Sequence, residues 1–150
     1  MEGITKDNKR FTHKTVVTWD EEKKAFLCSL GRQTIEIAAP PESKKHEGMR
    51  TPQELFVASV EGFIKDAFAD SAKKSGFEFL GYESEAEGVI EKVEDRLMFT
   101  EIKIRPQITV ASDIQTGEAK ELIELAVKNC FILNFITCKV NIYPEIKIGL

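Results

Sequence analysis

The sequence lacks the cysteine pairs that mark a disulfide framework or a zinc site. Its three cysteines, Cys28, Cys130 and Cys138, are an odd number and form no CxxC pair. We therefore expect free thiols, as in a reducing compartment. The two histidines, His13 and His46, are far apart and have polar neighbours, which favours surface side chains over metal ligands.

Long apolar runs are also absent. No run approaches the ~20 residues that a membrane span needs, and the first ten residues, MEGITKDNKR, hold no signal-peptide core. We expect a cytoplasmic protein without a membrane segment. The net charge of −4, without a basic stripe, argues against nucleic-acid binding. No glycine-rich phosphate loop is present, and the sequence predicts no cofactor.

The length of 150 residues is typical of a single domain with its own core, which we expect to span residues 1–150. The N-terminal part predicts a three-stranded meander, because β-branched and aromatic residues gather in short runs between turn signals. The expected strands are 12–19, 25–30 and 33–39, with turns at 20–24 and 31–32 and a loop at 40–50.

A long helix is predicted between Thr51 and Gly76. Thr51 fits the N-cap, Pro52 fits the first helical position, and Glu54 lies three residues after the cap, which makes a capping box. Gly76 fits the left-handed residue that follows a helix. Residues 55–68 are apolar over most of the helix circumference, so we expect other elements or a partner chain to cover them.

Two long runs of alternating residues then predict an antiparallel hairpin. Pro106 removes a hydrogen-bond donor from the second strand, which predicts an edge or a bulge there. A helix from Thr116, its expected cap, to about Asn129 follows. The two strands of the hairpin are expected at 77–93 and 96–111, with its tip at 94–95. A short helical turn at 131–136 and a C-terminal strand at 138–148 follow the second helix. The order βββ-α-ββ-α-β predicts an α+β fold with helices against antiparallel sheets.

This order and two motifs resemble the OsmC/Ohr family over nearly the whole chain. Residues 51–55, TPQEL, with Ala58 and Gly62, are similar to the family pattern (T/N)PEELLxAAxAGC. Residues 125–130, LAVKNC, are similar to its LAxxxCP pattern. The N-terminal strand that ends in Trp19, before a short hairpin, resembles the general OsmC-like branch more than the organic hydroperoxide resistance branch.

The resemblance implies an OsmC-like fold in an intertwined homodimer, with long helices at its centre. It also implies a stress-response and redox role. Active members reduce organic hydroperoxides in a peroxiredoxin-like manner with two thiols, of which one attacks the peroxide and the other closes a disulfide. A glutamate on the helix and an arginine from the N-terminal region set the environment of the attacking thiol.

Three of the four catalytic positions that the resemblance implies have changed. Phe63 stands where the family has the attacking cysteine, and Gln53 stands where it has the glutamate. No Gly-Gly-Arg occurs in the first hairpin. Cys130 remains at the position of the resolving thiol, but Phe131 replaces the proline that follows it. We expect lost or altered peroxidase activity.

Two hypotheses stay open. In the first, the protein is a redox enzyme with relocated chemistry, for which Cys130 and Glu54 are the candidate catalytic residues. Cys130 ends a helix, where the dipole disfavours a thiolate, and Glu54 is also explained as a cap. In the second, the protein is a binding module without catalysis that holds a small apolar ligand at the dimer interface. The candidate binding residues are Gln53, Phe56, Phe63 and Phe131.

Overall fold

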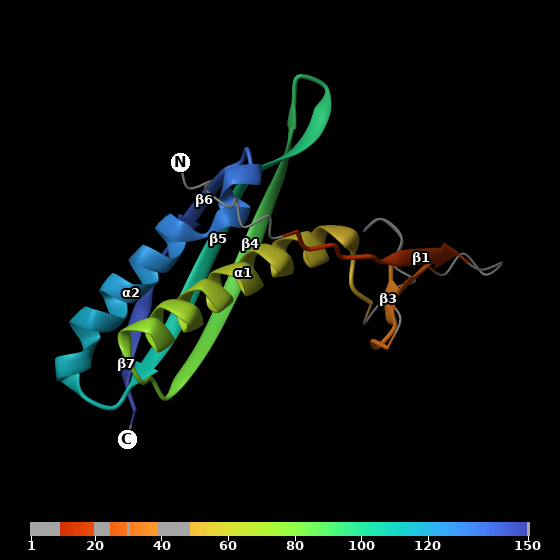
Figure 1. Ribbon diagram of the computed structural model, residues 1–150. Helices are drawn as coiled ribbons and strands as arrows, with labels where there is room; N and C mark the ends of the chain where they lie inside the picture. Colours follow the sequence, from red (N-terminus) through yellow and green to blue (C-terminus); the bar gives the residue numbers. More distant parts are fainter. Residues whose placement is uncertain (1–9, 20–24, 30, 39–48, 150) are drawn as a thin grey trace, which may run out of the picture. The chain divides into compact units, whose positions relative to one another are not determined.

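The computed structural model describes residues 10–19, 25–29, 31–38 and 49–149 (Figure 1). The chain divides into two compact units, residues 1–52 and 53–150, and each is described by itself. The charged turn at 20–24, most of the loop at 40–50, and His46 lie outside the described residues. That the units form one domain stays a prediction.

The first unit is a three-stranded antiparallel sheet in the order β1-β2-β3. Its strands are Val16–Trp19 (β1), Ala25–Cys28 (β2) and Ile35–Ile37 (β3). The predicted meander is confirmed, although each strand is shorter than expected. Gly31 turns the chain with a φ of 73°, a conformation that glycine adopts without steric cost. The backbone of Ala38 donates a hydrogen bond to the carbonyl of Arg50 at 2.8 Å, which returns the chain to β3.

The second unit begins with the long helix α1, Pro52–Ser75, as predicted. Gly76 follows it with a φ of 66°. The Phe77 N–H donates to the Ala72 carbonyl at 2.9 Å, and the Gly76 N–H donates to the Lys73 carbonyl at 3.3 Å. These two bonds form a Schellman motif, which satisfies carbonyls at the helix end.

The predicted hairpin consists of β4, Gly81–Val93, and β5, Arg96–Val110. Glu94 and Asp95 form its tip with φ values of 47° and 65°, and a two-residue turn with two positive φ angles matches the strand twist. The expected start of β4 at residue 77 is wrong, because Phe77 completes the end of α1. The pairing shifts between Val89 and Ile90, so the ladder has a bulge there.

The C-terminal strand is two strands rather than one. Both β6, Lys139–Ile142, and β7, Glu145–Ile148, pair with the same side of β5, and both are parallel to it. The chain breaks the ladder at Tyr143 and Pro144. This parallel pairing differs from the antiparallel sheets that the sequence predicted.

Pro106 lies in the central strand, so the predicted edge or bulge at this residue is wrong. The Ile104 carbonyl accepts a hydrogen bond from the Tyr143 N–H at 2.8 Å, so it points toward the break between β6 and β7. Backbone groups two residues apart in a strand point to the same side, and Pro106 is two residues after Ile104. The nitrogen of Pro106 therefore faces the break between β6 and β7, where the ladder needs no donor.

The second helix, α2, spans Thr116–Asn129, as predicted, after a short 3-10 turn at Asp113–Gln115 (η1). Thr116 is not its cap: the cap residue is Gln115, and the Thr116 hydroxyl donates back to the Asp113 carbonyl at 2.8 Å. The predicted turn after α2 is confirmed as a 3-10 helix at Phe131–Phe135 (η2).

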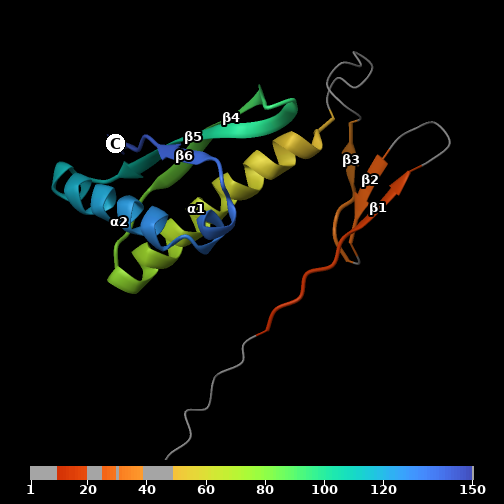
Figure 2. The same ribbon diagram turned by 90° about the horizontal axis from the view of Figure 1, so that it is seen from above.

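Both helices cover one face of the sheet formed by β4 to β7 (Figures 1 and 2). The core of this unit lies between them, and α1 buries Val60, Ile64, Phe68 and Ala72 at a spacing of four residues. This is the α+β fold that the sequence predicts. Among the described residues, no helix is long and apolar enough to cross a membrane.

Candidate functional site

Phe63, which the resemblance aligns with an attacking cysteine, lies against η2. Its ring contacts the ring of Phe131 edge-on, with the centroids 5.1 Å apart and the planes at 86°. Phe63 is half-buried against the core, whereas Phe131 is exposed. The fold thus brings α1 and the residue after Cys130 together within one chain. We call this contact the α1–η2 seam.

Cys130 lies between α2 and η2 and is buried with the core residues. Only 5% of it is exposed. Burial raises the pKa of its thiol, although backbone hydrogen bonds from Ile132 and Leu133 oppose this shift. The end of α2 does not stabilise a Cys130 thiolate, because the carbonyl end of a helix disfavours a negative charge. The Cys130 side chain is therefore a protonated core thiol at neutral pH rather than an activated nucleophile.

A hollow of about 260 Å³ opens at the side of α1 that carries Phe56. The rings of Phe56 and Phe99 lie 5.0 Å apart and are tilted by 44°. The hollow is lined by Phe56, Met98, Phe99, Phe135, Ile136, Thr137 and Cys138. We call it the Phe56 hollow. Sequence reasoning found Phe56 but missed the other lining residues, because they come from three separate segments.

Cys138 is in phase with Val140 and Ile142, and all three side chains are partly buried against the core. The structure places Cys138 just before β6, half-buried and in the wall of the Phe56 hollow. Burial raises the pKa of its thiol. Its exposure makes it a chemical reporter of this hollow, whereas Cys130 is not among the lining residues.

Gln53 and Glu54 lie in the first turn of α1, and both are exposed. Neither lines the Phe56 hollow. The structure places Glu54 where a capping carboxylate belongs, near the positive end of the helix dipole. The roles of Glu54 in catalysis and of Gln53 in binding stay predictions.

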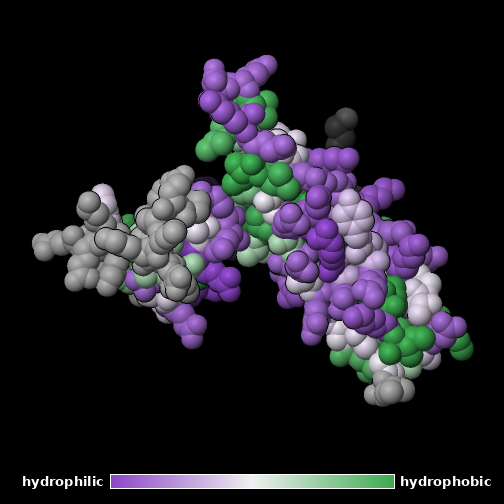
Figure 3. Space-filling view, turned by 180° about the vertical axis from the view of Figure 1, so that it is seen from behind, coloured by the Kyte–Doolittle hydropathy of each residue, from purple (hydrophilic) through white to green (hydrophobic). Residues whose placement is uncertain are grey.

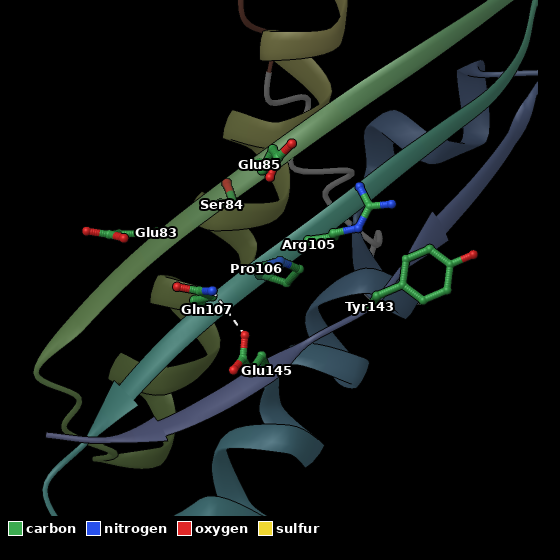
Figure 4. Close-up of a pocket in the computed structure, with 8 residues that line it drawn as sticks. All are labelled: Glu83, Ser84, Glu85, Arg105, Pro106, Gln107, Tyr143 and Glu145. Carbon is green, nitrogen blue, oxygen red and sulfur yellow. Dashed lines mark hydrogen bonds between the residues drawn. The ribbon is translucent and has the colours of Figure 1, made fainter.

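The opposite face of the sheet carries a second hollow, of about 300 Å³, over the break between β6 and β7. Figure 4 shows charged side chains of three strands around it. The Arg105 guanidinium lies 5.8 Å from the centre of the Tyr143 ring, and Gln107 donates to the Glu145 carboxylate at 3.0 Å. Because these polar groups pair with one another, this surface is a solvated sheet face. Among the described residues, no cluster of histidine, cysteine and carboxylate side chains could hold a metal ion.

A small polar cluster interrupts the apolar contact between α1 and β4. The Ser84 hydroxyl donates a hydrogen bond to the Glu61 carboxylate at 2.5 Å. Tyr82, two residues earlier on the same face of β4, has a buried hydroxyl without a hydrogen-bond partner. Burial raises the pKa of Tyr82 to about 12; the nearby Ser84 side chain opposes this shift, and the Glu61 charge adds to it. Sequence reasoning missed this cluster.

Comparison with protein families identifies the relatives of the chain. The model of the OsmC-like protein family matches residues 45–145. This range includes α1, both hollows and Cys130. A search of curated protein sequences finds no significant match.

Solved structures with the same fold span nearly the whole chain. An OsmC-like protein of unknown function from Vibrio cholerae is 22% identical with a TM-score of 0.78, over 90% of this chain and 99% of that one. An organic hydroperoxide resistance protein, OsmC, from Legionella pneumophila is 17% identical with a TM-score of 0.68, over 92% and 99%. The organic hydroperoxide resistance protein OhrB of Bacillus subtilis is 19% identical with a TM-score of 0.67, over 91% and 98%. The chain belongs to the OsmC-like protein family.

Proposed function

We propose that this OsmC-like protein has lost thiol peroxidase chemistry and binds a small apolar ligand beside α1, within a homodimer. The observation that carries the proposal is the contact of Phe63 with Phe131 next to a buried Cys130. At the position where the active members place a thiol, this chain places an aromatic ring.

The loss of peroxidase chemistry follows from what the reaction needs. A peroxide is reduced when a thiolate attacks its O–O bond, and the thiolate requires a lowered pKa and access to the substrate. Phe63 has no nucleophile. Cys130 is buried with a raised pKa, and Cys138 also has a raised pKa. No thiol of the second unit meets both requirements.

The ligand site is supported by the apolar surface along one side of α1. Phe56 and Phe63 are seven residues apart, which places them on the same helix face. Phe56 lines the Phe56 hollow, and Phe63 forms the α1–η2 seam. Aromatic and thioether side chains of this kind line sites for small apolar molecules.

The homodimer is supported by the apolar side chains that each unit leaves exposed. In the first unit, Val17 is 63% exposed and Trp19 is 73% exposed. In the second unit, the hairpin of β4 and β5 exposes Ile90, Val93 and Leu97 (Figure 3). Exposed apolar side chains that gather on one element are typical of an interaction site. The family resemblance names a second copy as the partner, and light scattering after size exclusion will measure the mass in solution.

The test is the rate at which the protein consumes cumene hydroperoxide with a dithiol reductant. We expect no turnover above that of the reductant alone. Cys130→Ser should leave this background unchanged. The redox hypothesis predicts the opposite pair of results: turnover by the native protein and its loss in Cys130→Ser. That pair would overturn the proposed loss of peroxidase activity.

A further inference from the structure

The Phe56 hollow differs in its chemistry from two other hollows of the second unit. Its seven lining residues include three aromatic rings, a thioether, a thiol and no charged side chain. The hollow beside α2 includes Glu124, and the hollow on the outer sheet face includes three glutamates and Arg105. Of these three hollows, the Phe56 hollow therefore suits an uncharged guest best.

The geometry of the rings restricts the guest further. Phe56 and Phe99 are tilted by 44° at a centroid distance of 5.0 Å, so their faces and edges are presented at an angle. Another aromatic ring can stack on one and meet the edge of the other, which are the arrangements that aromatic pairs prefer. The sulfur atoms of Met98 and Cys138 lie in the same wall, and sulfur contacts aromatic ring edges favourably.

The size of the hollow sets the size of the guest. An apolar cavity of roughly 150 Å³ is enough for benzene, and the Phe56 hollow offers about 260 Å³. The space suits one aromatic ring with a short branched substituent. A carboxylate on that ring would lose hydration without gaining a cation, because none of the lining residues is basic.

We propose that the Phe56 hollow binds a neutral aromatic molecule, one ring with a short alkyl or hydroxyalkyl substituent, and rejects its carboxylate analogue. This inference rests on the proposed function, since it names the ligand class of the same apolar surface. Phe56 and Phe99 form the stacking surface, and Cys138 reports on occupancy.

The experiment compares two matched probes on the full chain. The neutral probe is 2-phenyl-2-propanol, and the charged probe is 4-isopropylbenzoate, which keeps the ring and a branched substituent. Titration calorimetry or ligand-observed NMR measures both dissociation constants. The neutral probe should bind about tenfold or more tightly than the charged probe. It should also slow alkylation of Cys138 by a maleimide without slowing alkylation of Cys28.

The matched variants are Thr137→Phe and Asn134→Phe. Thr137 lines the hollow, whereas Asn134 does not, and both side chains are exposed. The added ring should therefore spare the fold in both, which thermal unfolding will check. Thr137→Phe should fill the hollow and weaken binding of the neutral probe by about tenfold. Asn134→Phe should leave that affinity unchanged.

The outcomes separate this inference from the proposed function. If the neutral probe binds but Thr137→Phe has no effect, the ligand lies elsewhere on α1; the inference fails and the proposed function stands. If neither probe binds and Cys138 is shielded from alkylation only in a dimer, a second copy of the chain fills the hollow. The inference and the ligand site of the proposed function then both fail. Equal affinity for the two probes would also overturn the inference.

Discussion

The ring of Phe63 lies edge-on against the ring of Phe131, with their centroids 5.1 Å apart. Phe131 follows Cys130 directly in the chain, so this contact brings α1 close to Cys130 within one chain. Under the proposed function, this aromatic contact stands in place of the attacking thiol of the active family members. Edge-to-face pairs of this kind contribute about 0.5–1.5 kcal/mol beyond the burial of their area.

Phe63→Cys should return a thiol to this position. With cumene hydroperoxide, the new thiol should become a sulfenic acid and release the alcohol. Condensation with the Cys130 thiol should then form a disulfide and release water. Mass spectrometry without reductant will show a loss of two hydrogens and a crosslinked peptide. Phe63→Ser is the control, and an oxidised Phe63→Cys protein without a link to Cys130 would contradict the arrangement.

Gly88→Ala should destabilise the second unit. A Cβ atom at residue 88 would lie 2.6 Å from Cγ2 of Val57 and 2.8 Å from Cε1 of Phe99. Displacing these side chains should cost about 1–3 kcal/mol in the free energy of unfolding, measured by urea denaturation. Gly117→Ala is the matched control, because its Cβ meets nothing within 4 Å and alanine favours the helix. Equal losses in both variants would refute the close approach at Gly88.

Tyr82→Phe should stabilise the protein. The Tyr82 hydroxyl is buried and has no hydrogen-bond partner, and an unsatisfied buried group costs about 1–3 kcal/mol. Removing it should raise the urea midpoint, whereas Ser84→Ala should lower it, since that change leaves the Glu61 carboxylate without its donor. A lower midpoint for Tyr82→Phe would mean that the hydroxyl has a partner.

Tyr82 should also make stability depend on alkaline pH. Burial raises its pKa from 10.0 to about 12 in the folded protein. Between these values the unfolded chain has released the phenol proton and the folded chain still holds it, so the free energy of unfolding falls as the pH rises. The urea midpoint of the native protein should drop more between pH 9 and pH 11 than that of Tyr82→Phe. Parallel curves for the two proteins would exclude this linkage.

Phe68→Ala should be the most damaging of the core changes considered. Phe68 is fully buried between α1 and the sheet and contacts the rings of Phe79 and Tyr82. Truncation of a buried phenylalanine costs about 3–5 kcal/mol. Phe135→Ala, at a side chain that is 76% exposed, should change stability by less than about 0.5 kcal/mol. Similar losses for the two would contradict the placement of the core.

Local signals in the sequence predict much of this fold. Pro52 and Gly76 mark the two ends of α1, and the Glu94–Asp95 tip marks the hairpin, because caps and turns depend on neighbouring residues. The two family motifs are also short stretches of sequence, so they draw attention to Phe63 and Cys130 without any knowledge of the fold. The cytoplasmic location stays a prediction.

The features that sequence reasoning missed depend on contacts between distant segments. Pro106 reads as a strand edge in isolation, yet the break at Tyr143 and Pro144 lets it stay in the central strand. The Phe56 hollow joins α1, β5 and the segment before β6, so no single stretch of sequence contains it.

The central claim, that the chain keeps the fold without the thiol chemistry, is tested most directly by counting thiols. The native protein is titrated with a thiol reagent under denaturing conditions before and after exposure to cumene hydroperoxide. We predict three free thiols per chain in both samples, as in the sequence. Loss of one thiol per chain, with sulfenic acid at Cys130 or Cys138, would contradict the claim and identify the residue that has taken over the attack.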